Sequence, residues 1–95
     1  MTSIESVYRQ IVDMTRRHGI RRVTLFGSRA RGDNDAKSDI DIAAEGCPDF
    51  LAFEEDVQEN LWSLLKVDTV NLDEAVSDGL RADIQRDGKV LYEAL

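Results

Sequence analysis

The chain has 95 residues, of which 19 are acidic and 12 basic, giving a formal net charge of −7 at pH 7. This length predicts one domain spanning residues 1–95, large enough to bury about two-thirds of its unfolded surface. The acidic balance argues against tight binding to a nucleic-acid backbone, since such binding needs many phosphate-neutralising lysines and arginines. One cysteine, Cys47, excludes an internal disulfide, and no apolar run is long enough to span a bilayer, so we expect no membrane contact and a cytoplasmic protein.

A first helix is predicted from Ile4 to about His18. The segment Thr2-Ser3-Ile4-Glu5 fits a capping box, and apolar residues then recur on one helical face: Ile4, Val7, Tyr8, Ile11 and Met14. Gly19 ends this helix. His18 is the only histidine, and its place at a helix end favours a capping or solvent-exposed role over a catalytic one.

A short apolar run, Val23–Phe26, predicts a buried strand that stops at Gly27-Ser28. A residue without a side chain lets another group approach the backbone closely, and we expect a phosphate there. The polar stretch that follows, to Lys37, predicts a short helix that Ser28 caps, with amide groups facing the anion. Arg29 and Arg31 can each bind phosphate oxygens or remain solvated surface arginines, and both interpretations stay open.

The segment Asp39-Ile40-Asp41-Ile42 opens a second predicted strand, Ile40–Ala44. Alternation along a strand puts the isoleucines on one face and both carboxylates on the other. Two such carboxylates repel by about 4 kcal/mol at ~4 Å and an effective dielectric constant near 20, so they need compensation. Mg²⁺ prefers hard oxygen ligands and is commonly bound by one or two carboxylates together with substrate phosphates. The pattern therefore predicts a nucleotide that binds with its metal.

Two helices and two strands are expected after residue 45. A long helix starts near Pro48 or Asp49, and its inward stripe is Phe50, Phe53, Val57, Leu61 and Leu64, with Leu51, Trp62 and Leu65 on one flank. Trp62 is expected to be half covered. The short strand Val67–Val70 carries Asp68 between apolar residues, where a carboxylate is costly unless it is paired or metal-bound. A helix containing Leu80 and Ile84 then ends at Gly88, before an edge strand at Lys89–Tyr92.

Gly27-Ser28, ten intervening residues and Asp39-x-Asp41 resemble the signature of the DNA polymerase beta-like nucleotidyltransferase superfamily. The longer form, Gly-Ser-Arg-Ala-Arg-Gly…Ser-Asp-Ile-Asp-Ile, resembles the minimal nucleotidyltransferase (MNT) family, and the resemblance covers nearly the whole chain. It implies an α/β fold with a mixed sheet of about four strands and helices packed on it. It also implies that Gly27 and Ser28 hold the triphosphate and that Asp39 and Asp41 bind metal.

The resemblance assigns Asp68 the place of the superfamily's third carboxylate. That residue completes a site for two Mg²⁺ ions ~3.5–4 Å apart and activates the attacking hydroxyl. A structural interpretation remains open beside this one, in which Asp68 only closes a strand end or pairs with an arginine. The implied reaction transfers a nucleoside monophosphate, AMP from ATP, to a hydroxyl acceptor with release of pyrophosphate.

In the resembled MNT family, the acceptor is a tyrosine of a partner HEPN-domain toxin, and the small transferase acts as its antitoxin. A net charge of −7 would steer this chain toward a basic partner. Two alternatives stay open: an antitoxin-like protein that masks its partner without catalysis while binding nucleotide, and a subunit of a small-molecule (antibiotic) adenylyltransferase. The second is disfavoured, because those enzymes add another domain for the acceptor.

Overall fold

The computed structural model describes residues 3–94. Its elements are, in chain order, α1 (Ile4–Arg17), β1 (Arg22–Phe26), α2 (Ser28–Arg31), β2 (Ile40–Glu45), α3 (Phe50–Asn60), β3 (Val67–Asn71), α4 (Asp78–Asp87) and β4 (Lys89–Glu93). The four strands form one mixed sheet in the order β3-β2-β1-β4, with β2 and β3 parallel and the other pairs antiparallel. The predicted α/β fold with a four-stranded mixed sheet is therefore confirmed. None of the described helices is long and apolar enough to cross a membrane.

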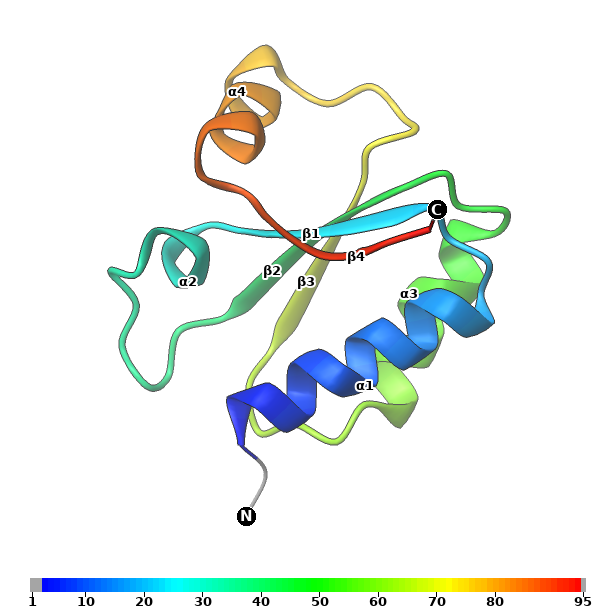
Figure 1. Ribbon diagram of the computed structural model, residues 1–95, viewed down its shortest axis with the longest axis horizontal. Coiled ribbons are helices and arrows are strands. Elements are labelled where there is room, and N and C mark those ends of the chain that lie inside the picture. Colours follow the sequence, from blue (N-terminus) through cyan, green and yellow to red (C-terminus); the bar gives the residue numbers. More distant parts are fainter. Residues whose placement is uncertain (1–2, 95) are drawn as a thin grey trace.

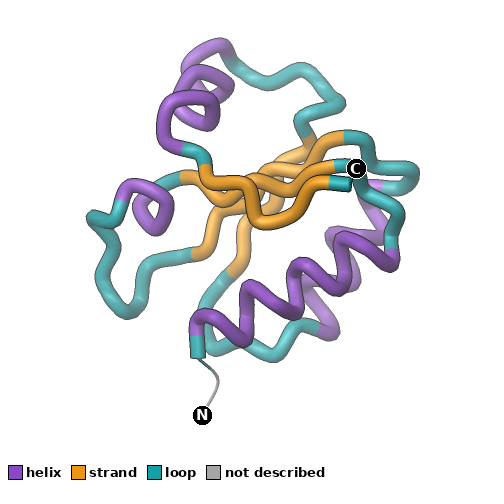
Figure 2. Tube along the Cα trace, in the orientation of Figure 1, coloured by secondary structure: helices purple, strands orange, loops and turns teal. Residues whose placement is uncertain are grey.

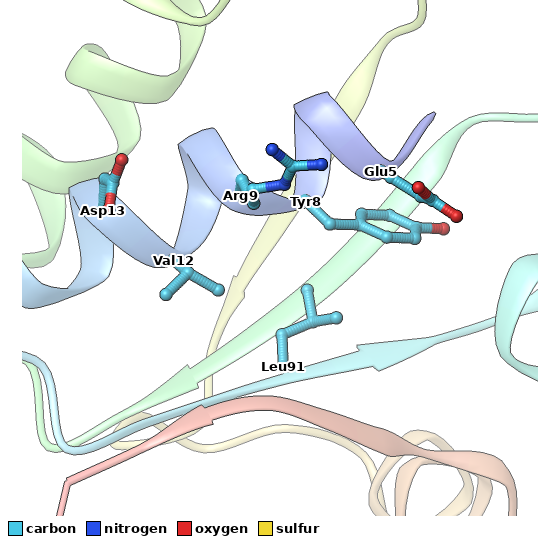
Figure 3. Close-up of a pocket in the computed structure, with 6 residues that line it drawn as sticks. All are labelled: Glu5, Tyr8, Arg9, Val12, Asp13 and Leu91. Atoms are coloured by element: carbon cyan, nitrogen blue, oxygen red, sulfur yellow. The ribbon is translucent and has the colours of Figure 1, made fainter. Parts of the chain in front are cut away.

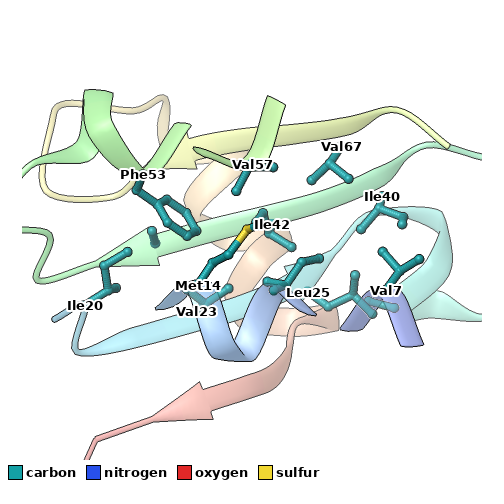
Figure 4. Close-up of a cluster of buried hydrophobic side chains, with 13 residues drawn as sticks. Val7, Met14, Ile20, Val23, Leu25, Ile40, Ile42, Phe53, Val57 and Val67 are labelled. Atoms are coloured by element: carbon teal, nitrogen blue, oxygen red, sulfur yellow. The ribbon is translucent and has the colours of Figure 1, made fainter. Parts of the chain in front are cut away.

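Helices cover the two faces of the sheet unequally. α1 and α3 pack side by side on one face, while α4 lies on the other (Figure 1). The tube view shows the same arrangement, with the short α2 and its following loop beyond the end of β1 (Figure 2). The hydrophobic core fills the space between the sheet and the α1–α3 layer, where Met14, Phe53 and Ile42 lie among smaller aliphatic side chains (Figure 4).

The helix starts follow their capping residues. Ser3 caps α1, its Oγ accepting a hydrogen bond of 3.1 Å from the amide of Ser6. Thr2, the first residue of the predicted capping box, lies outside the described residues. Asp49 caps α3 and accepts from the amide of Ala52 at 3.1 Å. His18 is the C-cap of α1, as its position predicts, and its ring nitrogen lies 2.8 Å from Asp56 Oδ2.

The prediction for the end of the third helix is wrong. α3 stops at Asn60 because Leu61 has an extended backbone, with ψ of 126°. Phe53 and Val57 are buried as predicted, but Leu64 is 100% exposed and lies outside the helix. Trp62 is 78% exposed rather than half covered. The apolar stretch after Asn60 is thus a surface loop that leads into β3.

Alternation along β2 separates the core from the polar residues of the sheet. Ile40, Ile42 and Ala44 are buried in the core cluster beneath α1 and α3. Asp41 lies between them in the sequence and therefore points to the opposite face. Asp39 precedes the first residue of β2, so the expectation that both carboxylates sit within the strand holds only for Asp41.

Candidate active site

Three carboxylates gather at one end of the sheet, on or beside β2 and β3. Asp41 is the register partner of Asp68 across the parallel pair, and Asp39 lies two residues before Asp41. Partial burial raises the pKa of the Asp41 carboxyl, and the negative charges of Asp68 and Asp39 raise it further. Arg31 and Lys66 oppose this pKa shift without cancelling it. The end of the sheet therefore carries an excess of negative charge that a cation would relieve.

The chemistry of these donors fits Mg²⁺, although they do not form a complete cage. Within residues 3–94, no three His, Cys, Asp or Glu side chains are arranged to hold an ion by themselves. Mg²⁺ is usually bound through one or two carboxylates, with phosphates and water completing its octahedral shell. The side chains of Asp39 and Asp41 carry oxygen donors of this kind, and the excess negative charge around Asp41 favours a bound cation.

Asp68 occupies a more open position than its apolar neighbours predict. β3 is an edge strand, and the Asp68 side chain is 42% exposed. Lys66 Nζ lies 3.3 Å from Asp68 Oδ1, so the carboxylate is paired with a lysine in this structure. The expected cost of burying Asp68 is therefore small. Sequence reasoning missed Lys66, which the spacing of two residues along an extended chain places on the same side as Asp68.

Gly27 lies directly against the carboxylate of Asp41. Its backbone has φ of +74° and ψ of −156°, a conformation that L side chains rarely adopt. A Cβ atom built on Gly27 would meet Asp41 Oδ2. The glycine therefore permits the turn after β1 to touch the first carboxylate of β2. This contact joins the predicted phosphate-binding turn to the predicted metal-binding strand.

The short helix α2 begins differently from the prediction. Gly27, and not Ser28, is its N-cap, and no side chain donates or accepts a capping hydrogen bond there. Ser28 is the first helical residue, so the expectation that Ser28 caps the helix is wrong. Its hydroxyl is consequently not engaged in capping, while the amides of Ala30 and Arg31 bond back to the carbonyl oxygen of Gly27 at 3.1 Å.

The two arginines of α2 lie in different surroundings. Arg31 is 43% exposed, pairs with Asp33 at 3.1 Å, and exerts a favourable charge interaction on ionised Asp41. Arg29 instead directs its guanidinium to backbone carbonyls of the loop before Asp39, including the oxygen of Ser38 at 3.0 Å. A phosphate-binding role for either residue stays a prediction, and the exposed guanidinium of Arg31 is the better placed to reach a ligand.

A separate hollow lies between α1 and β4. Its volume is about 440 Å³, and it is lined by Glu5, Tyr8, Arg9, Val12, Asp13 and Leu91 (Figure 3). None of the carboxylates at the end of the sheet contributes to it. Its polar groups all come from one helix, α1, and they do not converge on a common point as a catalytic site requires. We therefore assign the candidate site to the Gly27–Asp41 contact.

Replacing Asp41 with asparagine is expected to stabilise the metal-free protein at neutral pH. The folded-state pKa of Asp41 is raised above its unfolded value, so ionisation of this group destabilises the fold and stability falls as pH rises between the two pKa values. Thermal melting with a chelator should show a higher melting temperature for Asp41→Asn at pH 7, by roughly 4–8 °C per kcal/mol of relieved repulsion. The difference should shrink in acid, where wild-type Asp41 becomes protonated. An equal or lower melting temperature at pH 7 would contradict the prediction.

Comparison with known proteins gives one family match and one curated relative. The sequence pattern of the family described as "Polymerase beta, Nucleotidyltransferase" matches residues 9–94. The Methanocaldococcus jannaschii protein named "Putative protein adenylyltransferase MJ0435" is 40% identical over 43 residues. That alignment covers 45% of this chain and 46% of the relative, so the chain spans less than half of the relative's length.

Solved structures resemble the fold over most of the chain. A chain from a crystal structure of a toxin–antitoxin with AMP-PNP is 27% identical, with a TM-score of 0.67 and coverage of 92% of this chain and 73% of that one. A chain from the complex of tri-AMPylated Shewanella oneidensis HEPN toxin with MNT antitoxin is also 27% identical. Its TM-score is 0.69, with coverage of 95% of this chain and 72% of that one.

Proposed function

Because this chain belongs to the polymerase beta nucleotidyltransferase family, we propose that it transfers AMP from Mg²⁺-bound ATP to a tyrosine of a HEPN-domain toxin, acting as the antitoxin. The observation that carries the proposal is the contact of Gly27 with the Asp41 carboxylate. This contact brings a backbone turn suited to phosphate beside a charged group suited to the metal that accompanies phosphate. Asp68 lies next to Asp41 in the sheet register, where a third acidic group is needed.

The related complexes support the choice of acceptor and nucleotide. One similar structure contains a HEPN toxin that carries AMP groups, in complex with an MNT antitoxin. Another contains AMP-PNP, an analogue of ATP. We extend the same partner class and the same nucleotide to this chain. Since the proposed reaction consumes ATP, we also propose a cytoplasmic location.

The proposed roles follow from the chemistry of each residue. Gly27 and Ser28 bind the triphosphate through backbone amides and a hydroxyl, and Arg31 neutralises phosphate charge. Asp39, Asp41 and Asp68 are proposed to hold two Mg²⁺ ions, which supply Lewis acidity and charge neutralisation when bound. Asp68 accepts the proton of the attacking tyrosine hydroxyl. The tyrosine oxygen forms a bond to the α-phosphorus, and the bond from that phosphorus to the bridging oxygen breaks, releasing pyrophosphate.

The arrangement of the elements suits a protein acceptor. α4 covers the sheet face opposite α1 and α3 (Figure 1), and the Asp68 side chain remains partly exposed. A tyrosine presented by another protein can approach such an open site. The net charge of −7 favours a basic partner and predicts that association weakens as salt increases.

Incubation with Mg²⁺, ATP and the HEPN protein of the native host is expected to add about 329 mass units per AMP to that protein. The modified protein should lose its nuclease activity, and peptide mapping should locate AMP on a tyrosine. Intact-mass spectrometry measures the transfer, with Asp41→Asn as the inactive control. A partner that is inhibited but unmodified would support the non-catalytic masking function instead. Absence of both binding and modification would refute the proposed partner.

A further inference from the structure

We propose that Arg29 is a positioning residue, which holds the loop before Asp39 against α2 and thereby sets the separation between the Gly27-Ser28 turn and Asp39. This inference rests on the proposed function, because it concerns how the same site is assembled. It differs from the phosphate-binding role that the sequence left open for Arg29. The proposal assigns the guanidinium to three carbonyl oxygens of the chain itself.

The contacts of Arg29 converge on the segment that leads into β2. Its Nε donates to the carbonyl oxygen of Ser38 at 3.0 Å. Its Nη2 lies 3.5 Å from the carbonyl oxygen of Asp35 and 3.4 Å from that of Ala36. The planar guanidinium can reach these acceptors together because its nitrogens form a rigid fork. Ser38 is the residue immediately before Asp39, so the shortest of the three bonds fixes the backbone next to a proposed metal ligand.

The loop has few other attachments to the rest of the fold. Asp35 and Ser38 form a local turn, in which Ser38 Oγ accepts from the Asp35 amide at 3.0 Å and Asp35 Oδ1 accepts from the Lys37 amide at 2.8 Å. These bonds shape the loop without attaching it to α2. Beyond the loop, the amide of Ile40 donates to the carbonyl oxygen of Lys66 at 2.9 Å. This bond anchors the start of β2 to the residue that precedes β3. At the start of the loop, the amide of Asp33 donates to the carbonyl oxygen of Ser28 at 3.2 Å. Arg29 attaches the later part of the loop, from Asp35 to Ser38, to α2.

Arg31 shows the contrast within the same short helix. Its guanidinium pairs with the exposed Asp33 side chain and remains 43% exposed, so its ion pair can exchange for a phosphate at little cost. Arg29 would have to leave three carbonyl oxygens to reach a ligand. The two arginines therefore have different proposed roles: Arg31 contacts the ligand, and Arg29 orders the loop that contains Asp39.

The test compares Arg29→Lys and Arg29→Met with Lys37→Met. Lysine keeps the charge but loses the planar fork, and methionine loses both. Lys37 is an exposed cation on the same loop whose side chain forms no hydrogen bond or ion pair with the described residues, so it controls for a change of charge. Hydrogen exchange of the ligand-free proteins is measured first. The amides of residues 33–39 should exchange at least about tenfold faster in both Arg29 variants and unchanged in Lys37→Met.

Calorimetry then separates positioning from phosphate binding. Both Arg29 variants should weaken Mg²⁺ affinity in the presence of ATP by about 10–100-fold, the usual effect of removing a group that orients a metal ligand. ATP affinity without Mg²⁺ should stay within about twofold, because no phosphate contact is lost. A general loss of folding would appear in thermal melts as a lower melting temperature, and Arg29→Lys keeps the test valid if Arg29→Met is unstable.

Unchanged exchange in residues 33–39 would overturn the proposal. A second pattern would also overturn it: Arg29→Lys keeps the wild-type Mg²⁺ affinity, and Arg29→Met loses affinity for ATP without Mg²⁺. That pattern identifies direct phosphate binding by Arg29. Failure of the proposed function gives a different result. If the wild-type protein binds neither ATP nor Mg²⁺, the catalytic proposal falls, while the exchange measurement still decides whether Arg29 orders the loop.

Discussion

Asp68→Asn is expected to lower the rate of AMP transfer by about 10²–10⁴-fold, the usual contribution of a general base. The carboxylate lies beside Asp41 on an edge strand and is 42% exposed, so an acceptor hydroxyl can reach it from solvent. Asparagine keeps the size of the side chain but cannot accept the proton. Affinity for Mg²⁺-bound ATP should remain within about a few-fold, because the proposed triphosphate contacts lie on Gly27 and Ser28 and two proposed metal ligands, Asp39 and Asp41, are kept. Single-turnover kinetics with the HEPN partner measures the rate, and calorimetry measures the affinity.

The ion pair between Lys66 and Asp68 allows the catalytic interpretation to be separated from the structural one. If Asp68 served only to hold Lys66, then Lys66→Met and Asp68→Asn would have equal effects on rate and stability. We expect Lys66→Met to change the rate much less, since an exposed pair contributes about 0–1 kcal/mol. Glu74→Gln removes an exposed carboxylate just after β3 and serves as the control for net charge. Equal loss of rate in Lys66→Met and Asp68→Asn would contradict the general-base role.

The central motif was predictable because local chemistry determines it. The alternation of Ile40, Asp41 and Ile42 alone indicates a core face and a polar face, and both are present in the structure. Glycine at position 27 indicated a close approach, and the structure places the Asp41 carboxylate there. The sequence indicated that glycine is needed at position 27, but it could not identify Asp41 as the neighbour. Asp41 lies on β2, so the contact depends on how the strands pair.

The end of α3 was not predictable for a related reason. Apolar residues continue past Asn60 at helical spacing, and neither glycine nor proline marks the stop. The structure ends the helix where the backbone of Trp62 pairs with Gln10: its amide donates to Gln10 Oε1 at 2.8 Å, and its carbonyl accepts from Gln10 Nε2 at 3.1 Å. These partners lie 52 residues apart in the sequence. A side chain on α1 thus supplies the hydrogen bonds that would otherwise continue the helix.

The role of Arg29 stayed ambiguous for the opposite reason, because the chemistry of arginine fits two kinds of acceptor. Phosphate oxygens and backbone carbonyls both accept from a guanidinium fork. The path of the loop, which turns at Asp35 and brings the Ser38 carbonyl back to α2, is what places backbone acceptors beside Arg29. The same argument applies to Ser28. Its side chain suits an N-cap, but Gly27, with its positive φ, takes the N-cap position and the helix starts one residue earlier, at Ser28.

Gly27→Ala is expected to weaken the affinity for Mg²⁺-bound ATP by more than about 150-fold, equivalent to about 3 kcal/mol. The added Cβ would meet Asp41 Oδ2, so either the turn or the carboxylate must move. Displacement of the turn misplaces the amides proposed to bind phosphate, and displacement of Asp41 misplaces a proposed metal ligand. Calorimetric titration of Mg²⁺ and ATP together measures the loss. Ser28→Ala should cost less, about 1.5–3 kcal/mol at most, because it removes only one hydrogen bond to a charged group.

Two other glycines separate steric contact from backbone strain. Gly32 also has positive φ, of +86°, but a Cβ there meets no atom within 4 Å. Gly32→Ala should therefore lower stability by about 1–2 kcal/mol through strain alone and leave nucleotide affinity nearly unchanged. Gly79 lies in the first turn of α4 with open space around it, so Gly79→Ala should leave affinity unchanged and stabilise the helix by up to about 1 kcal/mol. If Gly27→Ala and Gly32→Ala reduce affinity equally, the loss comes from strain in the α2 segment, and the contact of Gly27 with Asp41 has no part in binding.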